Sequence, residues 1–433
     1  MAATHPASKL SRRRVLRVLG GAALSAAPLG FVRRLAAEPA RGRRVVVLGG
    51  GIAGCTVAAE LRRLAPDAEV AVVEPAADLF LGPASLDVAF GRRPLADAVR
   101  GYGPLAARGV RMVRGEAKAV DLGKRNVTTT AGAFAYDALV LATGIRLAPE
   151  EIKGLAGDPA ANATLYDRDG VVRLAKRIEA FAGGKVVVNV PDGALKCPPA
   201  PYEFVLLMAE RMKARKLKGQ IVLIDAWPTP QPGPLGEALL NALSAHGDLI
   251  DYVSQGQVQS VDTGARKVTM ASGEDFDYDL LSLIPPNRAS RLVVELGLAD
   301  EGDVFAAVDP VTLRSIRDAH VFAAGDVART PFGKSASAAA SMAHNCAEEV
   351  ARMLGVKGLA ARSAAEPARV VTVCYPHVDR DRALKLRTDH AVSGAGPALR
   401  YEPKTLADAA AKAANVAERQ AWEKSLVNGI FGG

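Results

Sequence analysis

The chain of 433 residues is long enough for two or three domains, and its 49% of hydrophobic residues can supply a sizeable core. Frequent glycine (41 residues) and few aromatic residues (5%) fit an α/β protein better than a β-sandwich. The formal net charge of +9 would suggest a nucleic-acid-binding face, but the distribution of the charge argues against one. Residues 1–44 hold ten Lys or Arg against one acid, and the remainder is neutral.

The first forty residues carry the pattern of an export signal. Residues 11–16 read Ser-Arg-Arg-Arg-Val-Leu, a twin-arginine pattern, and a weakly apolar stretch of about fifteen residues follows over 18–32. We predict a Tat signal peptide over residues 1–40 and a periplasmic protein; an uncleaved basic tail is the alternative. No later segment has 18 uninterrupted apolar residues, so we expect no transmembrane segment.

A glycine-rich turn follows the first expected strand, the β-branched run at 45–48. Gly49, Gly51 and Gly54 match the G-x-G-x-x-G spacing, and an Ala-rich helix is expected over 55–64. The first glycine permits the tight turn, the second lets the backbone approach a pyrophosphate, and the third lets the helix pack on the strand. The helix N-terminus then faces the phosphates.

A second strand over 69–74 ends with Glu74, 20 residues after Gly54, where an acid can bond ribose hydroxyls. This β-turn-α-β unit predicts binding of a dinucleotide. The alternative is a glycine-rich loop that only turns the chain.

Two later segments indicate FAD as that dinucleotide. A strand over 136–142 runs into Thr143-Gly144, and a strand over 319–324 ends in Gly325-Asp326. With the first turn, they resemble the three FAD motifs of the two-dinucleotide-domain flavoprotein superfamily. That resemblance implies that Asp326 bonds the ribityl chain or the pyrophosphate. It also implies that the helix beginning near Ala336 points its N-terminus at the flavin.

The segment 151–292 is expected to form a second dinucleotide-type domain, opening with a strand over 185–190. The turn after that strand contains Pro198, Pro199 and Pro201 instead of the glycine pattern. Proline lacks an N–H group and fixes φ, so this loop is poorly suited to holding a pyrophosphate. We expect the domain to keep its fold without binding NAD(P)H.

The fold class that follows is α/β, with two Rossmann-like, three-layer dinucleotide-binding domains and a C-terminal α+β interface domain. The expected boundaries are an FAD-binding domain over 41–150 and 293–363, the second domain over 151–292, and the C-terminal domain over 364–433.

The four cysteines include no C-x-x-C pair and have no histidines at zinc spacing, so we expect no metal site. Cys55 and Cys346 lie on expected helices and are interpreted as core residues. His377 could tune the nearby Cys374, but a surface histidine is the preferred interpretation. No C-x-x-C-H motif is present, so the chain is expected to carry no c-type haem of its own.

Several short segments are distinctive: Cys-Pro-Pro-Ala-Pro-Tyr-Glu at 197–203, Leu-Ile-Pro-Pro-Asn-Arg-Ala at 283–289, Gly-Asp at 325–326 followed by Lys-Ser at 334–335, Cys-Tyr at 374–375, and Trp422. Through them, essentially the whole mature chain resembles the flavoprotein subunit of flavocytochrome c sulfide dehydrogenase.

This resemblance implies a redox-active disulfide between Cys197 and Cys374 above the flavin. Hydrosulfide would attack one of the two sulfurs, and the freed thiolate would pass two electrons to FAD and on to a c-type cytochrome subunit. A structural disulfide or two buried thiols are the alternatives. Glu203 is a candidate base or else a helix N-terminal acid. Lys334 is a candidate flavin neighbour or else a solvated loop charge.

The chain departs from the family at Gly82. Many members attach FAD covalently through a cysteine in a segment that matches 78–85 here, and Gly82 stands at that cysteine's position. We therefore expect non-covalent FAD. The substrate could accordingly be sulfide or a related reduced sulfur compound.

Two other functions stay open. The chain could be an NAD(P)H-dependent disulfide or ferredoxin-type reductase, or a non-catalytic flavoprotein partner in a sulfur-oxidation complex. Reduction of the flavin by sulfide and not by NAD(P)H would favour sulfide oxidation over the reductase. Loss of sulfide-dependent cytochrome reduction in Cys197→Ser would favour it over the non-catalytic partner.

Overall fold

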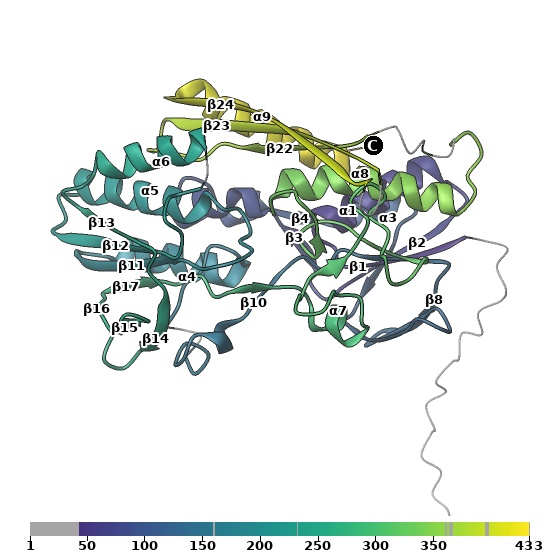
Figure 1. Ribbon diagram of the computed structural model, residues 1–433, viewed down its shortest axis with the longest axis horizontal. Coiled ribbons are helices and arrows are strands. Elements are labelled where there is room, and N and C mark those ends of the chain that lie inside the picture. The colour runs from purple at the N-terminus through teal and green to yellow at the C-terminus, as the bar shows by residue number, and fades with distance from the viewer. Residues whose placement is uncertain are drawn as a thin grey trace, which may run out of the picture. The chain divides into compact units, whose positions relative to one another are not determined.

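A five-stranded parallel sheet forms one half of the fold (Figure 1). The computed structural model describes residues 43–158, 161–231, 233–359, 362, 367–394 and 398–432, so the signal predicted over 1–40 lies outside the described residues. In spatial order the strands are β20 (Val321–Ala323), β9 (Ala138–Leu141), β1 (Arg44–Leu48), β2 (Glu69–Glu74) and β5 (Arg111–Arg114).

The central strand explains the sheet's position. Residues 45–48 of β1 are all buried, as expected for a parallel strand between two covered faces. Because the strands are parallel, their carboxyl ends meet at one edge. Open α/β sheets bind ligands at this edge. Three turns follow strands there, at Gly49, Thr143-Gly144 and Gly325-Asp326, and Glu74 is the last residue of β2 at the same edge.

Helices α1 (Ile52–Leu64) and α8 (Ala336–Met353) pack against each other beside this sheet. Smaller elements complete this half: β3 (Asp78–Phe80), η1 (Gly82–Ala84), α2 (Ser85–Ala89), η2 (Leu95–Ala98), β4 (Val99–Gly101), α3 (Gly103–Ala107), β6 (Ala117–Asp121), β7 (Asn126–Thr129), β8 (Gly132–Ala135), α7 (Arg291–Glu295), β19 (Ala306–Ala307) and β21 (Ala328–Arg329).

A second parallel sheet repeats the plan with four strands. Their order is β13 (Ile250–Ser254), β12 (Gly219–Asp225), β11 (Gly184–Val190) and β17 (Leu280–Ser282). Helices α4 (Arg168–Ala180), α5 (Ala200–Ala214) and α6 (Pro234–Ser244) and the antiparallel strands β14 (Val258–Asp262), β15 (Lys267–Met270) and β16 (Asp275–Asp277) accompany it. β10 (Arg146–Leu147), η3 (Pro149–Glu151) and β18 (Asn287–Arg288) lie on the two connections between the halves.

The C-terminal elements lie across both halves (Figure 1). They are the antiparallel strands β22 (Ala368–Cys374), β23 (Ala383–Ser393) and β24 (Arg400–Lys412) and the helix α9 (Ala413–Phe431). β22 packs on α8, β23 and β24 contact α6, and α9 contacts α1. None of the helices in the described ranges is long and apolar enough to cross a membrane. The predicted α/β class with Rossmann-like sheets is confirmed.

The glycines of the first turn serve different physical needs. A Cβ on Gly54 would lie 1.9 Å from the carbonyl oxygen of Gly49, so helix and turn are in contact through glycine alone. Gly49 has φ +106° and Ala142 at its back. A Cβ on Gly51 would have no atom within 4 Å and would extend into open space. The third glycine is therefore a folding requirement, and the second leaves room for a ligand.

This difference gives a test on the ligand-free protein. Gly54→Ala is expected to lower the free energy of unfolding by about 3 kcal/mol or more, because backbone must move. Gly51→Ala, at the helix N-cap, is expected to stay within about 1 kcal/mol of the unmutated protein while lowering its FAD content. Urea unfolding and the ratio of flavin to protein absorbance measure the two effects. Equal destabilisation by both changes would contradict this assignment.

Candidate functional site

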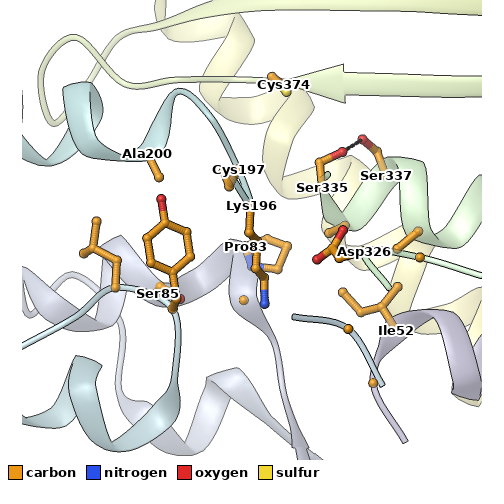
Figure 2. A pocket seen from close by; sticks show the side chains of 18 of the residues that line it. Ile52, Pro83, Ser85, Lys196, Cys197, Ala200, Asp326, Ser335, Ser337 and Cys374 are labelled. Carbon is orange, nitrogen blue, oxygen red and sulfur yellow. Dashed lines mark hydrogen bonds between the residues drawn. The ribbon is translucent and has the colours of Figure 1, made fainter. Parts of the chain in front are cut away.

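A cavity lies at the carboxyl edge of the first sheet and extends to the second domain and the C-terminal segment. Its lining includes the expected cofactor residues Gly51, Gly144, Gly325 and Asp326. It also includes all three candidate catalytic residues, Cys197, Cys374 and Glu203. Figure 2 shows the two cysteines on separate elements, with Ser335, Ser337 and Asp326 beside them.

The polar atoms at the sheet edge suit FAD. Within the described residues, Asp326 Oδ1 and Thr143 Oγ1 are buried without a hydrogen-bond partner, which is rare unless a ligand or water supplies one. Gly144 and Gly325 have φ of +65° and +82°, so both turns depend on glycine. The unpaired oxygens could accept hydrogen bonds from the ribityl hydroxyls of FAD, and the open space at Gly51 would leave room for its pyrophosphate.

Glu74 stands at the predicted place beside the first turn. Its Oε2 accepts a hydrogen bond from the backbone N–H of Gly50 at 2.6 Å, and its Oε1 accepts one from Ala76 at 2.8 Å. These bonds hold the carboxylate against the turn. A ribose contact from Glu74 stays a prediction.

A short segment, Lys334–Ser337, positions both cysteines. The N–H of Cys197 donates to the carbonyl of Lys334 at 2.7 Å. Ser337 Oγ accepts from the N–H of Val373 at 3.0 Å and lies 3.1 Å from the carbonyl of Val373, the residue before Cys374. Ser335 caps α8 by accepting from Ala338 N–H. The segment that begins helix α8 thus joins the Cys197 loop to the end of strand β22, which is far away in sequence.

Cys197 itself has an uncommon backbone. Its φ is +49°, a left-handed conformation that β-carbon-bearing residues seldom adopt, and it precedes two prolines. Such conformations persist where the surroundings fix them and are concentrated at functional sites. All four cysteines are free thiols in this structure, so the structure brings Cys197 and Cys374 into one cavity without a bond between them. Their pairing as a disulfide stays a prediction.

Lys334 uses its ammonium group within the protein. Nζ donates to the carbonyls of Asp326 at 2.7 Å and Ala328 at 3.1 Å and lies 3.7 Å from the Phe305 ring centre. Burial lowers the pKa of Lys334 to about 8, against the opposing effect of Asp326. The alternative of a solvated loop charge is wrong. A side-chain contact from Lys334 to the flavin stays a prediction.

Glu203 is buried, and the two cysteines are half-buried. Burial raises the pKa of Glu203 to about 7, although Arg419 and the His377 backbone N–H lower it. In the described part of the chain, Glu203 Oε1 has no partner. Burial raises the pKa of Cys374 to about 12, and Glu203 adds to this. Burial also raises the pKa of Cys197, with Lys196 and Arg419 opposing the shift. A carboxyl group that titrates near neutrality beside two thiols can accept and return a proton.

A buried ion network behind Glu203 was not anticipated from the sequence. Arg419, on α9, lies 3.0 Å from Asp87 and places Nη1 2.7 Å from His377 Nε2. Arg92 lies 2.6 Å from the same Asp87. His377 is 1% exposed, so its interpretation as a surface histidine is wrong. Burial and the two arginines lower the pKa of His377. Among sequence signals, only the helical spacing of Arg419 and Trp422, which both line the cavity, points to this face of α9.

The remaining expectations for cysteine are simple. Cys55 and Cys346 are both fully buried in the core, which confirms their interpretation. Among the described residues, no three or more His, Cys, Asp or Glu side chains gather as metal ligands would.

The second domain has an acid where Glu74 lies in the first. Asp225 ends β12 as Glu74 ends β2, but it is completely buried. Its carboxylate accepts hydrogen bonds from Tyr202 Oη at 2.7 Å, Tyr252 Oη at 2.8 Å and Trp227 N–H at 2.9 Å. The chain's own donors therefore occupy the position from which a ribose would be bonded.

The loop after β11 also departs from a nucleotide-binding turn. Residues 191–199 separate β11 from α5, and the Lys196 N–H donates to Asn287 Oδ1 at 2.9 Å while the next residue bonds Lys334. Pro199 caps α5 and Pro201 follows in its first turn, so donors are missing from the helix N-terminus.

Comparison with known proteins gives consistent relatives. A family model described as "Sulfide dehydrogenase (flavocytochrome c) flavoprotein chain, central" matches residues 171–285. A mitochondrial sulfide:quinone oxidoreductase of Dictyostelium discoideum is 23% identical over 309 residues, which are 69% of this chain and 68% of that protein. An NADH dehydrogenase-like protein of Mycobacterium tuberculosis is 32% identical over 304 residues, covering 66% of this chain and 72% of that protein.

In three dimensions, the sulfide:quinone oxidoreductase of Aquifex aeolicus has a TM-score of 0.72 with 19% identity, and the match covers 90% of this chain and 92% of that one. The fold and the 32% relative agree with the three FAD motifs read from the sequence. The chain therefore belongs to the family of FAD-dependent oxidoreductases that includes the NADH dehydrogenase-like protein, and it is also similar to the sulfide:quinone oxidoreductases.

Proposed function

We propose that this protein oxidises sulfide, or a closely related reduced sulfur compound, through Cys197 and Cys374 and passes the electrons to FAD. One observation carries the proposal: two cysteines from distant segments line one buried cavity with Glu203, next to the turns that fit FAD. FAD, when bound, supplies a two-electron acceptor that can be reoxidised by a partner.

The protein's own groups account for the sulfur chemistry. Hydrosulfide attacks one sulfur of a Cys197–Cys374 disulfide, so that the disulfide bond breaks, a persulfide bond forms and the other cysteine leaves as a thiolate. Glu203 in its carboxylate form takes the proton from hydrogen sulfide. Arg419, which opposes the rise of the Cys197 pKa, favours the negative charge that appears on sulfur.

The geometry of the second domain favours sulfide over NAD(P)H as donor. The proline-bearing loop and the saturated carboxylate of Asp225 leave neither a phosphate-binding turn nor a free ribose acceptor. This argues against an NAD(P)H-dependent reductase despite the name of the Mycobacterium relative. The pair of cavity cysteines argues against a flavoprotein that only binds partners.

For the electron acceptor, a quinone is the first candidate because the sulfide-oxidising relatives carry quinone in their names. The c-type cytochrome subunit expected from the sequence is the second, supported by the flavocytochrome c description of the matching family model. We keep the proposal of Tat export to the periplasm, which rests on the sequence of residues 1–40 alone.

The donor is tested by anaerobic titration of the purified holoprotein. Sulfide is expected to bleach the flavin absorbance and NADPH or NADH is not. Cys197→Ser should slow reduction by sulfide about a hundredfold or more with FAD retained, whereas Cys346→Ala, outside the cavity, should reduce normally. Reoxidation by a soluble quinone analogue and by a c-type cytochrome, compared side by side, identifies the acceptor. If sulfide reduces the flavin of Cys197→Ser as fast as that of the unmutated protein, the cysteine mechanism is wrong.

Glu203 predicts a particular dependence of stability on pH. Its folded-state pKa of about 7 exceeds the ordinary 4.5, so the folded state holds a proton that the unfolded state releases between those values. Stability is therefore lost as pH rises through this window, by up to about 3 kcal/mol. Glu203→Gln removes the loss, so its unfolding free energy relative to the unmutated protein should grow from pH 5 to pH 8.

The exposed Glu237→Gln is the control and should follow the unmutated protein at every pH, because its carboxyl is solvated before and after unfolding. Activity should separate the same variants: turnover by Glu203→Gln is expected to fall about a hundredfold or more and to lose its dependence on a group titrating near pH 7. If the unfolding free energies of Glu203→Gln and Glu237→Gln change with pH in the same way, Glu203 is not a protonated buried carboxyl group.

We also propose that FAD is held without a covalent bond. Gly82 lines the cavity and a Cβ there would meet no atom within 4 Å, so a cysteine would fit, but glycine offers no thiol. Acid precipitation of the holoprotein should leave all yellow colour in the supernatant. Colour that stays with the washed pellet would contradict the prediction.

A further inference from the structure

Tyr166 is a side chain of the cavity that neither the FAD motifs nor the cysteine pair explains. It lies directly before Asp167, the N-cap of α4, and lines the cavity together with Cys197. Within the described ranges, its hydroxyl is buried and has no hydrogen-bond partner. An unpaired buried hydroxyl costs free energy, and in native proteins such groups are uncommon without a reason.

The segment that carries Tyr166 is firmly held. Asn162 exchanges two hydrogen bonds with the backbone of Leu283, both at 2.8 Å, and Ser282 Oγ donates to the carbonyl of Ala163 at 2.8 Å. Asp167 accepts from Gly170 N–H at 2.7 Å. The chain is thus fixed on both sides of Tyr166, and a partner for the hydroxyl must come to it.

Cys197 is the reactive group that lines the same cavity as Tyr166. Burial raises the pKa of the Tyr166 phenol, and negative charge on Cys197 raises it further. The phenol therefore stays protonated and can act as a hydrogen-bond donor at neutral pH. Its donor strength is greatest toward a negatively charged acceptor in a dry site.

We propose that Tyr166 donates a hydrogen bond to the sulfur carried by Cys197 when that sulfur is negatively charged. This rests on the proposed function, in which opening of the disulfide leaves an electron pair on sulfur. The proton stays on the phenol, so the bond stabilises the charge without changing the balance of the step. The hydroxyl lacks a partner in the thiol state because its partner forms only during turnover, as in transition-state stabilisation.

Tyr166→Phe tests the proposal, and Tyr136→Phe is its matched control. Tyr136 also has a buried hydroxyl without a partner in the described chain, but it does not line the cavity. Neither change removes a bond from the resting protein, so both melting temperatures should be unchanged or higher. Only Tyr166→Phe should lower sulfide-dependent turnover, by about 10-fold to 100-fold, the effect of losing a hydrogen bond to a charged group.

A second readout follows Cys197 directly. In a Cys374→Ser background, Tyr166→Phe should raise the pH at which Cys197 reacts with iodoacetamide, as located by peptide mass spectrometry, because the thiolate has lost a donor. Unchanged turnover and alkylation overturn the proposal. A loss of FAD affinity with unchanged alkylation also overturns it, by assigning the hydroxyl to the cofactor. If sulfide does not reduce the flavin of the unmutated protein, the proposed function is wrong. The alkylation result still tests whether Tyr166 donates a hydrogen bond to Cys197.

Discussion

The hydrogen bonds from Lys334–Ser337 to both cysteine-bearing segments are the constraint on which the site depends. Lys334 holds the Cys197 backbone through its carbonyl, and Ser337 holds the end of β22 next to Cys374. The same segment starts α8, the helix packed against α1 of the FAD half. The Lys334 side chain fastens it to the carbonyl of Asp326. These contacts position the Cys197 loop and the end of β22 relative to the cofactor turns.

Charge is concentrated behind this assembly. The carboxylate of Asp87 is shared by Arg92 and Arg419, and burial and these cations also act on His377 and Glu203. Burying charged groups is costly unless they are paired, and here each cation has an anion within about 3 Å. Glu203 has one carboxylate oxygen without a hydrogen-bond partner among the described residues, and burial raises its pKa to about 7. Arg419 and Arg92 oppose that rise, so burial outweighs the network at Glu203.

Features that depend on neighbouring residues in the sequence could be predicted, and features that depend on contacts between distant segments could not. The turn at Gly49–Gly54 is local and can be identified from its spacing, and the turns at Thr143-Gly144 and Gly325-Asp326 from their resemblance to known FAD motifs. The burial of Cys55 and Cys346 follows from their places on expected helices. His377 was misassigned, and Arg419 was missed, because their burial depends on α9 packing against distant residues. The saturation of Asp225 depends on two tyrosines from different elements, which no periodic pattern reports. For Lys334, the sequence left a flavin neighbour and a solvated charge as alternatives, because its contacts with the carbonyls of Asp326 and Ala328 depend on the tertiary fold.

Under the proposed function, the loop between β11 and α5 places a cysteine where a pyridine-nucleotide enzyme needs phosphate donors. Residues 191–199 occupy the place where a dinucleotide domain turns tightly to cradle phosphate, and they carry Cys197 across to Lys334 instead. A short glycine turn would restore phosphate donors only by withdrawing the cysteine from the cavity. Freeing Asp225 would leave the hydroxyls of the buried Tyr202 and the half-buried Tyr252 without this acceptor. Conversion to a pyridine-nucleotide enzyme would thus need replacement of both the 191–199 loop and the Asp225 cluster. The new loop would no longer place Cys197 in the cavity.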